Sequence, residues 1–271
     1  MQGVTETLLF TLYMRYREST RPDAKLADRR YADLVNAIDF DFSIFDEIPE
    51  DMQLSIACRT LIFENLTRHF IDTHPESIII GLGSGLDFRH ERLDNGHAVW
   101  IDIDVPEVIA LRNAFFPETA RHYSIASSIL DFSWMQKIPK GLPTLFIAEG
   151  LFVYFTPVEV KHILSNLSRA FRGSEMILDV YNNWYVNAAK ESTPYSFLNK
   201  MYAMWKWGMD DWCEIEAVEP GIQFIEEYYQ YHGFGERMPA GLKAVLSGED
   251  GYSEREQAVI LTMSRVGHIR L

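Results

Sequence analysis

The chain has 271 residues, of which 47% are hydrophobic, and a formal net charge of −14. This length and apolar content suffice for one large domain with a sizeable core, and they argue against a disordered chain. The acidic surface repels phosphate backbones and no basic patch overrides it, so a nucleic-acid substrate is not expected.

Cysteine and histidine usage narrows the class of protein further. Cys58 and Cys213 are the two cysteines, which is too few for a disulfide framework or a zinc cluster and favours a reducing cytoplasm. The scattered histidines lack metal-binding spacing, so no metal site is predicted.

No apolar run reaches the ~20 residues that span a bilayer, and the start of the chain lacks signal-peptide features. We therefore expect a cytoplasmic protein without a membrane partner.

Residues 4–73 mix apolar and polar side chains at helical spacing. The clearest helix is predicted at about 51–72, where Leu54, Cys58 and Ile62 share one face, and Pro75 ends it. Residues 1–75 are therefore predicted to form a helical cap.

From residue 76 onward, short β-rich runs alternate with helical stretches. The runs are SIIIGL, AVWIDI, RHYSIA, PTLFIAE and EMILDVY. This alternation predicts β-α-β units and a mostly parallel sheet, with the α/β core over residues 76–182 and 219–271. After the fourth run, Thr156, Pro157 and Glu159 predict a capped helix start, and Gly173 predicts its end.

Residues 183–218 interrupt the alternation with an aromatic-rich insertion. This segment includes Tyr202, Trp205, Trp207 and Trp212. A late insertion in an α/β fold often covers the ligand crevice, so we predict a lid whose aromatic rings could stack on a flat substrate. The alternative is that these rings form only the core of the lid itself.

The run SIIIGLGSGLDFRHERL predicts a buried strand, a glycine turn and a helix start. Leu86 stands where the dinucleotide fingerprint has its third glycine, which disfavours a nicotinamide-dependent oxidoreductase. Asp104, at the tip of the second strand, is the preferred acceptor for a ribose diol, although it could instead cap the following helix. Glu149, after the fourth strand, could bind a ligand's ammonium group or be a solvated loop acid.

Three of these motifs together, GLGSGLDFR, DIDVPEVIALR and AEGLFVYFTP, resemble the leucine carboxyl methyltransferase family. The segment KWGMDDWCEIEAVEPG resembles its tetracenomycin-type polyketide O-methyltransferase branch. The resemblance runs from about residue 4 to near the end of the chain. It implies a class I methyltransferase fold, a Rossmann-like α/β sheet, with S-adenosylmethionine as the cofactor.

The resemblance also implies which residues bind the cofactor. Arg59, on the helix before the first strand, would pair with the methionine carboxylate, which an arginine fork suits. Some family members contact adenine through Asp-Leu after the third strand, and this chain departs from them there. The implied cofactor residues are Arg59, Gly81, Gly83, Gly85, Asp104, Ser128, Ile129 and Glu149.

The predicted activity is methyl transfer to a carboxylate or hydroxyl oxygen of a polyketide-like small molecule. Trp205, Trp207 and Tyr202 are the predicted substrate contacts, and no catalytic residue or oligomeric state is assigned. A carboxylate, with a pKa near ~4, needs no general base, whereas a hydroxyl would. The alternatives are carboxyl methylation of a protein C-terminus and a non-catalytic S-adenosylmethionine-binding module.

Overall fold

The computed structural model describes residues 4–191, 194–231, 235–247, 251 and 253–271. Residues 192–193, within the predicted lid, and residues 232–234, in the last core segment, lie outside these described residues. None of the helices in the described part of the chain is long and apolar enough to cross a membrane.

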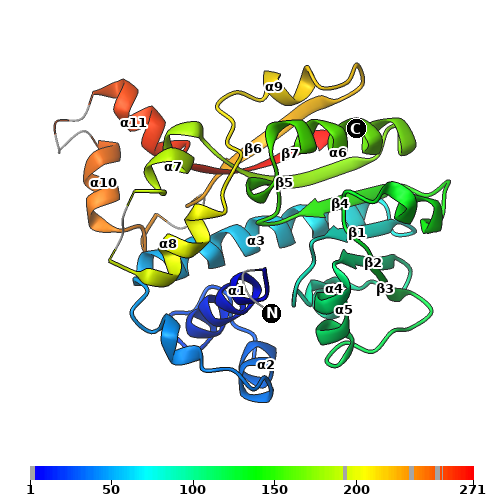
Figure 1. Cartoon of the computed structure of the whole chain (residues 1–271), viewed down its shortest axis with the longest axis horizontal. Helices are drawn as coiled ribbons and strands as arrows, with labels where there is room; N and C mark the ends of the chain where they lie inside the picture. The colour runs from blue at the N-terminus through cyan, green and yellow to red at the C-terminus, as the bar shows by residue number, and fades with distance from the viewer. Residues whose placement is uncertain (1–3, 192–193, 232–234, 248–250, 252) are drawn as a thin grey trace. The chain divides into compact units, whose positions relative to one another are not determined.

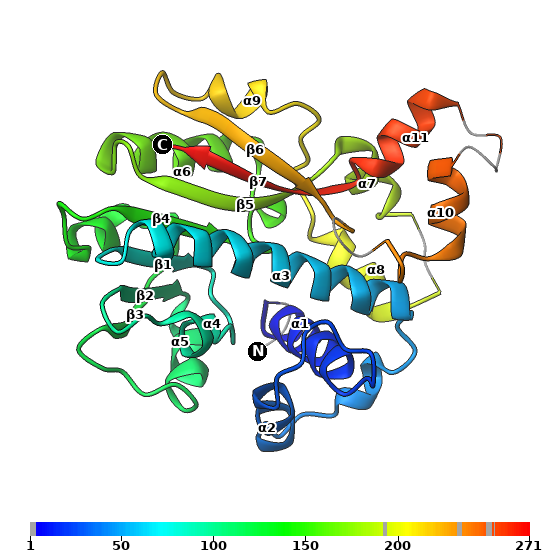
Figure 2. The same cartoon turned by 180° about the vertical axis from the view of Figure 1, so that it is seen from behind.

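Seven strands in the described part of the chain form one sheet. Their order is β3-β2-β1-β4-β5-β7-β6 (Figures 1 and 2). The five strands predicted between residues 76 and 182 are all present. The strands are β1 (Ile78–Leu82), β2 (Val99–Asp104), β3 (His122–Ala126), β4 (Thr144–Ala148), β5 (Glu175–Tyr181), β6 (Gln223–Tyr229) and β7 (Ser264–Arg270).

The sheet is mostly parallel, as the alternation predicts. β1 pairs in parallel with both β2 and β4, β2 with β3, and β4 with β5. β7 instead runs antiparallel to β5, because Leu271 N–H donates to Ser174 O at 2.8 Å while Asn182 N–H donates to Met263 O at 3.2 Å. Every residue of β4 is buried, as expected for a strand inside a sheet covered on both faces.

Helices connect and cover the strands. The predicted helix near residues 51–72 is α3, and the predicted capping box is present, since Thr156 N–H donates to Glu159 Oε2 at 2.7 Å and Glu159 N–H donates to Thr156 Oγ1 at 3.3 Å. The helices are α1 (Val4–Ser19), α2 (Arg30–Ala37), α3 (Glu50–Thr73), α4 (Arg89–Leu93), α5 (Pro106–Asn113), α6 (Pro157–Ala170), α7 (Asn183–Ala188), α8 (Ser196–Ala203), α9 (Cys213–Glu216), α10 (Ala240–Ser247) and α11 (Glu254–Leu261), with short 3-10 turns at Phe42–Phe45, Phe132–Lys137 and Phe152–Tyr154.

The chain divides into two compact units. The first unit comprises residues 1–62, 181–210 and 228–265, and the second unit comprises residues 63–180, 211–227 and 266–271. The second unit therefore contains the glycine turn and most of the sheet. The division into a helical cap, an α/β core and a lid stays a prediction.

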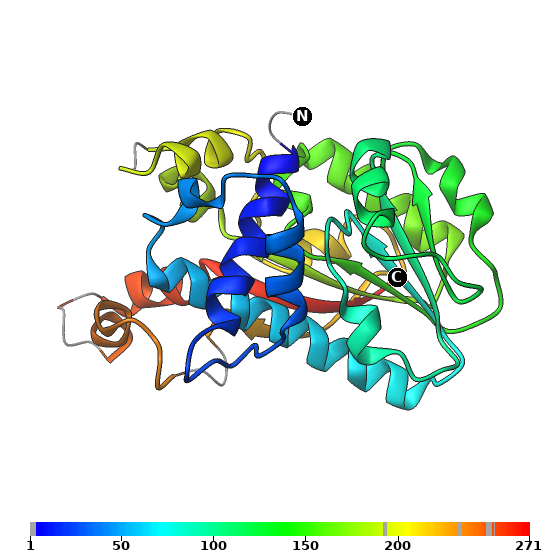
Figure 3. The same ribbon diagram turned by 90° about the horizontal axis from the view of Figure 1, so that it is seen from below.

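The first unit has a core of aromatic rings and contains buried charged side chains. Phe10 on α1 packs against Phe45 and Phe197, with ring centroids 5.5 and 4.9 Å apart. Arg15 Nε donates to Thr60 Oγ1 at 2.9 Å, which joins α1 to the first half of α3 (Figure 3). The fully buried carboxylate of Glu18 accepts from Arg237 at 2.6 and 3.0 Å. Because a buried charge requires a partner, this pair ties α1 to the later chain.

The strand order of the second unit indicates where a ligand binds. β1 lies between β2 and β4, so the chain leaves β1 on one side and later returns on the other. In open α/β sheets, ligands bind outside the carboxyl ends of the strands at such a switch point. The glycine turn follows β1 directly, and Asp104 and Glu149 lie at the carboxyl ends of β2 and β4.

Trp212, from the aromatic-rich insertion, belongs to the second unit and packs there. Its ring stacks on Phe224 with centroids 5.2 Å apart, and its Nε1 donates to Glu227 Oε2 at 2.6 Å. A Cβ placed on Gly267 of β7 would overlap this ring. For Trp212, packing rather than substrate contact is therefore the better interpretation.

We expect Gly267→Ala to destabilise the protein, because the added methyl group has to displace the Trp212 ring. Overpacking of this kind typically costs about 1–3 kcal/mol. Denaturant unfolding of the variant measures the loss. Gly221→Ala is the matched control, because a Cβ there meets only Ser168 Oγ, at 3.7 Å. Equal stability of the two variants would contradict the packing described for Trp212.

Candidate functional site

The glycine turn of the second unit has a backbone that requires glycine. Gly83 and Gly85 have φ values of +64° and +51°, which residues with a side chain rarely adopt. A Cβ on Gly83 would also lie 2.7 Å from Leu151 Cδ1, and one on Gly81 would lie 2.9 Å from Asp102 Oδ1. The glycines are thus required by the turn and by neighbouring side chains of the protein, whether or not a ligand approaches.

Asp104 lies at the tip of β2, beside this turn. Its Oδ2 accepts the Gly85 N–H and its Oδ1 accepts the Val105 N–H, both at 2.8 Å. Burial raises the pKa of the carboxyl group above its ordinary value of 3.8. Asp104 is not the N-cap of α5: that position is Val105, without a side-chain capping bond. Since each carboxylate oxygen can accept a second hydrogen bond, Asp104 retains capacity for two hydroxyl groups.

Ser128 and Ile129 follow β3 and lie next to the tip of β2. The link is the preceding residue, because Ser127 N–H donates to Asp104 O at 2.8 Å. Ser128 is exposed, whereas Ile129 is buried and its carbonyl accepts the Trp134 Nε1 hydrogen at 3.4 Å. The fold therefore brings both predicted adenine contacts to the same edge of the sheet as Asp104.

Glu149 forms an ion pair that the sequence analysis missed. Its carboxylate pairs with the guanidinium of Arg89, which is 3% exposed, and Arg89 Nε also lies 2.5 Å from Asp87 Oδ2. The next residue is fixed as well, since Gly150 N–H donates to Asp179 Oδ1 at 2.6 Å. Glu149 is therefore a buried, paired acid and not a solvated loop acid. The basic stretch RHERL, which forms α4, was the available signal.

The first unit brings Arg59 together with two of the predicted substrate residues. Arg59 Nη1 donates to Tyr181 Oη at 3.1 Å. Trp205 stacks on the Tyr181 ring at 4.6 Å, and Tyr202 meets Trp205 edge-on at 4.7 Å. Trp207 is buried in the same unit. We call Arg59, Tyr181, Tyr185, Tyr202 and Trp205 the aromatic cluster.

The aromatic cluster offers hydrogen-bond donors. The Trp205 Nε1–H is buried and meets no acceptor among the residues described. Burial raises the pKa of the Tyr202 phenol far above 10 and also raises that of Tyr185, so both phenols keep their protons near neutral pH. An indole N–H buried without a partner costs about 1–3 kcal/mol, so the Trp205 N–H is a candidate donor to a ligand.

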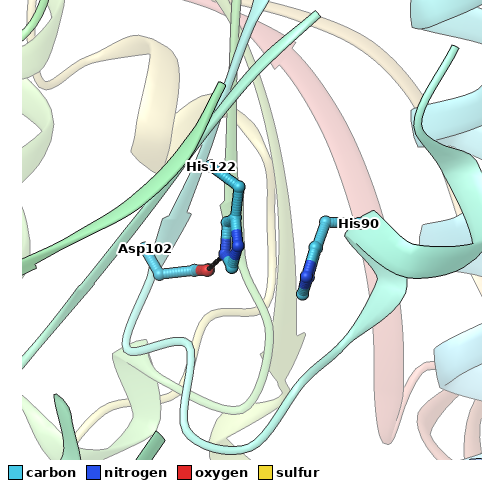
Figure 4. Close-up of side chains that lie close together, drawn as sticks. All are labelled: His90, Asp102 and His122. Carbon is cyan, nitrogen blue, oxygen red and sulfur yellow. Dashed lines mark hydrogen bonds and ion pairs between the residues drawn. The ribbon is translucent and has the colours of Figure 1, made fainter. Parts of the chain in front are cut away.

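His90, Asp102 and His122 form a second cluster that the sequence analysis missed (Figure 4). His122 Nε2 and Asp102 Oδ2 are 2.8 Å apart, and the rings of His90 and His122 stack at 3.7 Å with planes 22° apart. Nearly parallel stacked rings do not aim their in-plane lone pairs at one ion. The Arg112 guanidinium also pairs with the same Asp102 oxygen. This arrangement suits a hydrogen-bonded cluster better than a metal centre.

Charge in this second cluster is settled by burial and by Arg112. Burial and the neighbouring His122 lower the pKa of His90 to about 4, so His90 is neutral near pH 7. Burial alone would raise the pKa of Asp102, but Arg112 and His122 hold it well below its usual range. Asp102 is consequently an ion-pair partner and is not available to a ligand.

The groups at the carboxyl ends of the strands fit the cofactor that the motifs imply. A ribose diol needs two acceptors, and Asp104 is a carboxylate held by backbone N–H groups with lone pairs to spare. Ser128 and Ile129 lie beside it. The structure thus supplies the acid, the tight turn and the neighbouring loop in one place.

Comparisons with known proteins identify the family. The family model described as leucine carboxyl methyltransferase matches residues 11–168. The chain is 31% identical to tetracenomycin polyketide synthesis O-methyltransferase TcmP of Streptomyces glaucescens, over 84% of this chain and 83% of that one. It is 28% identical to the S-adenosyl-L-methionine-dependent methyltransferase dpfgK of Gibberella zeae, over 86% and 85% of the two chains.

Solved structures support the fold. A protein from Thermobifida fusca assigned as a methyltransferase superimposes with a TM-score of 0.58 and 16% identity, covering 97% of each chain. At that identity the likeness shows the fold alone. Because the family model covers more than half of the chain, this protein belongs to the leucine carboxyl methyltransferase family and is an S-adenosylmethionine-dependent methyltransferase.

Proposed function

We propose that this enzyme methylates an oxygen atom, in a carboxylate or hydroxyl group, of a polyketide-like small molecule. The aromatic cluster is the observation that carries the proposal, because its flat rings and buried Trp205 N–H suit a flat acceptor with a hydrogen-bond-accepting group. The relative TcmP, named for tetracenomycin polyketide synthesis, supports the same acceptor class. A small-molecule partner, no nucleic acid and a cytoplasmic location complete the proposal.

Of the two acceptor groups, the chemistry of the aromatic cluster favours a carboxylate. When bound, S-adenosylmethionine supplies an electrophilic methyl group on sulfur. A carboxylate is already ionised near pH 7, so the residues only have to orient it and exclude water. Tyr185 and Tyr202 hold their protons too tightly to act as bases, whereas the buried Trp205 N–H can donate to an anion.

We further propose that Asp104 binds the ribose of the cofactor and that Glu149, oriented by Arg89, binds its ammonium group. Ser128 and Ile129 are the proposed adenine contacts. Arg59 is the proposed partner of the cofactor's methionine carboxylate. These roles rest on the hydrogen-bonding capacity of each group and on the match to the family's motifs.

The position of the transferred methyl group distinguishes this proposal from the alternatives. The purified enzyme is incubated with methyl-labelled S-adenosylmethionine and a fractionated extract of the source organism. We expect label in small molecules, released as methanol by mild alkali, because methyl esters hydrolyse and methyl ethers do not. Label in polypeptide would instead indicate carboxyl methylation of a protein. A protein that binds S-adenosylhomocysteine but transfers no label would be a binding module.

Asp104→Asn should weaken binding of S-adenosylhomocysteine, because hydrogen bonds to a charged acceptor contribute about 1.5–3 kcal/mol each. Calorimetry measures the change. In the wild type, affinity should fall as the pH is lowered through the raised pKa of Asp104, above the ordinary value of 3.8. The variant should be weak at every pH.

The contribution of Asp104 to folding stability depends on pH in the opposite direction from its contribution to cofactor affinity. A carboxyl group with a raised pKa contributes stability at low pH that is lost as the pH rises through the folded-state pKa. If Asp104→Asn bound S-adenosylhomocysteine like the wild type, the ribose assignment would be wrong.

Trp205→Phe should reduce methyl transfer, since it removes the N–H but keeps an aromatic ring. Loss of one hydrogen bond to a charged acceptor corresponds to about a tenfold or larger effect. The readout is the KM for the acceptor, once labelling has found one. Trp184→Phe is the control, because the Trp184 side chain is 53% exposed in the same unit. Identical kinetics in both variants would mean that Trp205 only packs the unit.

A further inference from the structure

The side chain of Arg112 donates hydrogen bonds to the backbone of the glycine turn, and no motif assigns Arg112 a role. Its guanidinium is almost completely buried, at 1% exposure, and lies over the Phe116 ring at 4.9 Å. Nη1 donates to Gly85 O at 3.1 Å and also to Asp87 O. One side chain of α5 thus binds two backbone carbonyl groups of the turn that follows β1.

Gly85 links Arg112 to Asp104. The Gly85 C=O accepts from Arg112, while the Gly85 N–H donates to Asp104 Oδ2 at 2.8 Å. The same residue has φ +51°, and glycine left to itself moves freely among many backbone conformations. The orientation of the Asp104 carboxylate therefore depends on the N–H of a residue whose carbonyl group Arg112 fixes.

Arg112 is itself held in place. Its Nη2 pairs with Asp102 Oδ2, and His122 Nε2 lies 2.8 Å from the same oxygen. The His122 ring stacks on His90 (Figure 4). A planar guanidinium with three acceptors arranged around it has little freedom to rotate. The carbonyl groups of the turn that it binds are therefore held in place as well.

We propose that Arg112 is a positioning residue for the cofactor: it fixes Gly85 so that Asp104 presents its carboxylate to the ribose hydroxyls. The proposal rests on the proposed role of Asp104. Arg112 touches neither the cofactor nor the acceptor in this scheme. Its effect on binding passes through Gly85 and Asp104, and a purely structural arginine would have no such route.

A double-mutant cycle on S-adenosylhomocysteine binding tests this route. The variants are Arg112→Lys, Asp104→Asn and the double variant, and calorimetry is run well below each melting temperature. Lysine keeps the charge but cannot reach three acceptors at once. We expect Arg112→Lys to weaken binding by about tenfold. In the Asp104→Asn background the same change should cost less than about threefold, because coupled residues are not additive.

Arg121→Gln is the matched control. Arg121 also pairs with a carboxylate, Asp94, and donates to a backbone carbonyl, Ala98 O, at 3.0 Å. It lies at the opposite ends of β2 and β3 from the glycine turn, so its loss should leave cofactor affinity unchanged. Amide exchange of Gly85 is a second readout, which should become faster in Arg112→Lys and stay unchanged in Arg121→Gln.

The outcomes separate the two ideas. Wild-type affinity in Asp104→Asn would overturn the ribose role of Asp104. Weak binding in Asp104→Asn with wild-type affinity in Arg112→Lys would overturn only the positioning role. Losses that multiply in the double variant would also overturn it, because Arg112 would then act independently of Asp104. Arg112→Gln, which removes the charge, should show the same coupling with a larger single effect.

Discussion

Two buried arginines near the glycine turn determine what each acidic residue nearby can do. Arg89 and Arg112 are 3% and 1% exposed, and a buried guanidinium requires a carboxylate partner. Glu149 and Asp102 supply these partners. Asp104 has a different environment, because among the described residues its carboxylate accepts backbone N–H groups and no arginine hydrogen bond.

This difference in hydrogen-bond partners explains why Asp104 is the acid best suited to a neutral diol. A carboxylate already paired with arginine gains little from a hydroxyl group, whereas one held only by amides has acceptor capacity left. Burial raises the pKa of Asp104, which means that the protein without a ligand disfavours the ionised carboxylate. A ligand that donates hydrogen bonds to this carboxylate stabilises its ionised form. The ion pair with Arg112 thus shapes the site by occupying Asp102.

The aromatic cluster of the first unit has complementary chemistry. It contains a cation, phenols that keep their protons and an indole N–H without an acceptor among the described residues. A site rich in donors suits an anionic nucleophile, for which transfer of a methyl group requires alignment and no proton removal.

The sequence by itself determined the strands, the turn and the candidate acids, because these depend on local patterns. Short β-rich runs identified β1 to β5, Thr156 and Glu159 identified the start of α6, and the order of motifs identified the family and its cofactor. Only the tertiary structure decided the partners. Arg89, Arg112 and the His90–His122 stack come from separate elements, so no spacing along the chain reveals that they meet. The same holds for Trp212, whose contacts with Phe224 and Gly267 depend on how distant strands pack and not on the residues that surround it in the sequence.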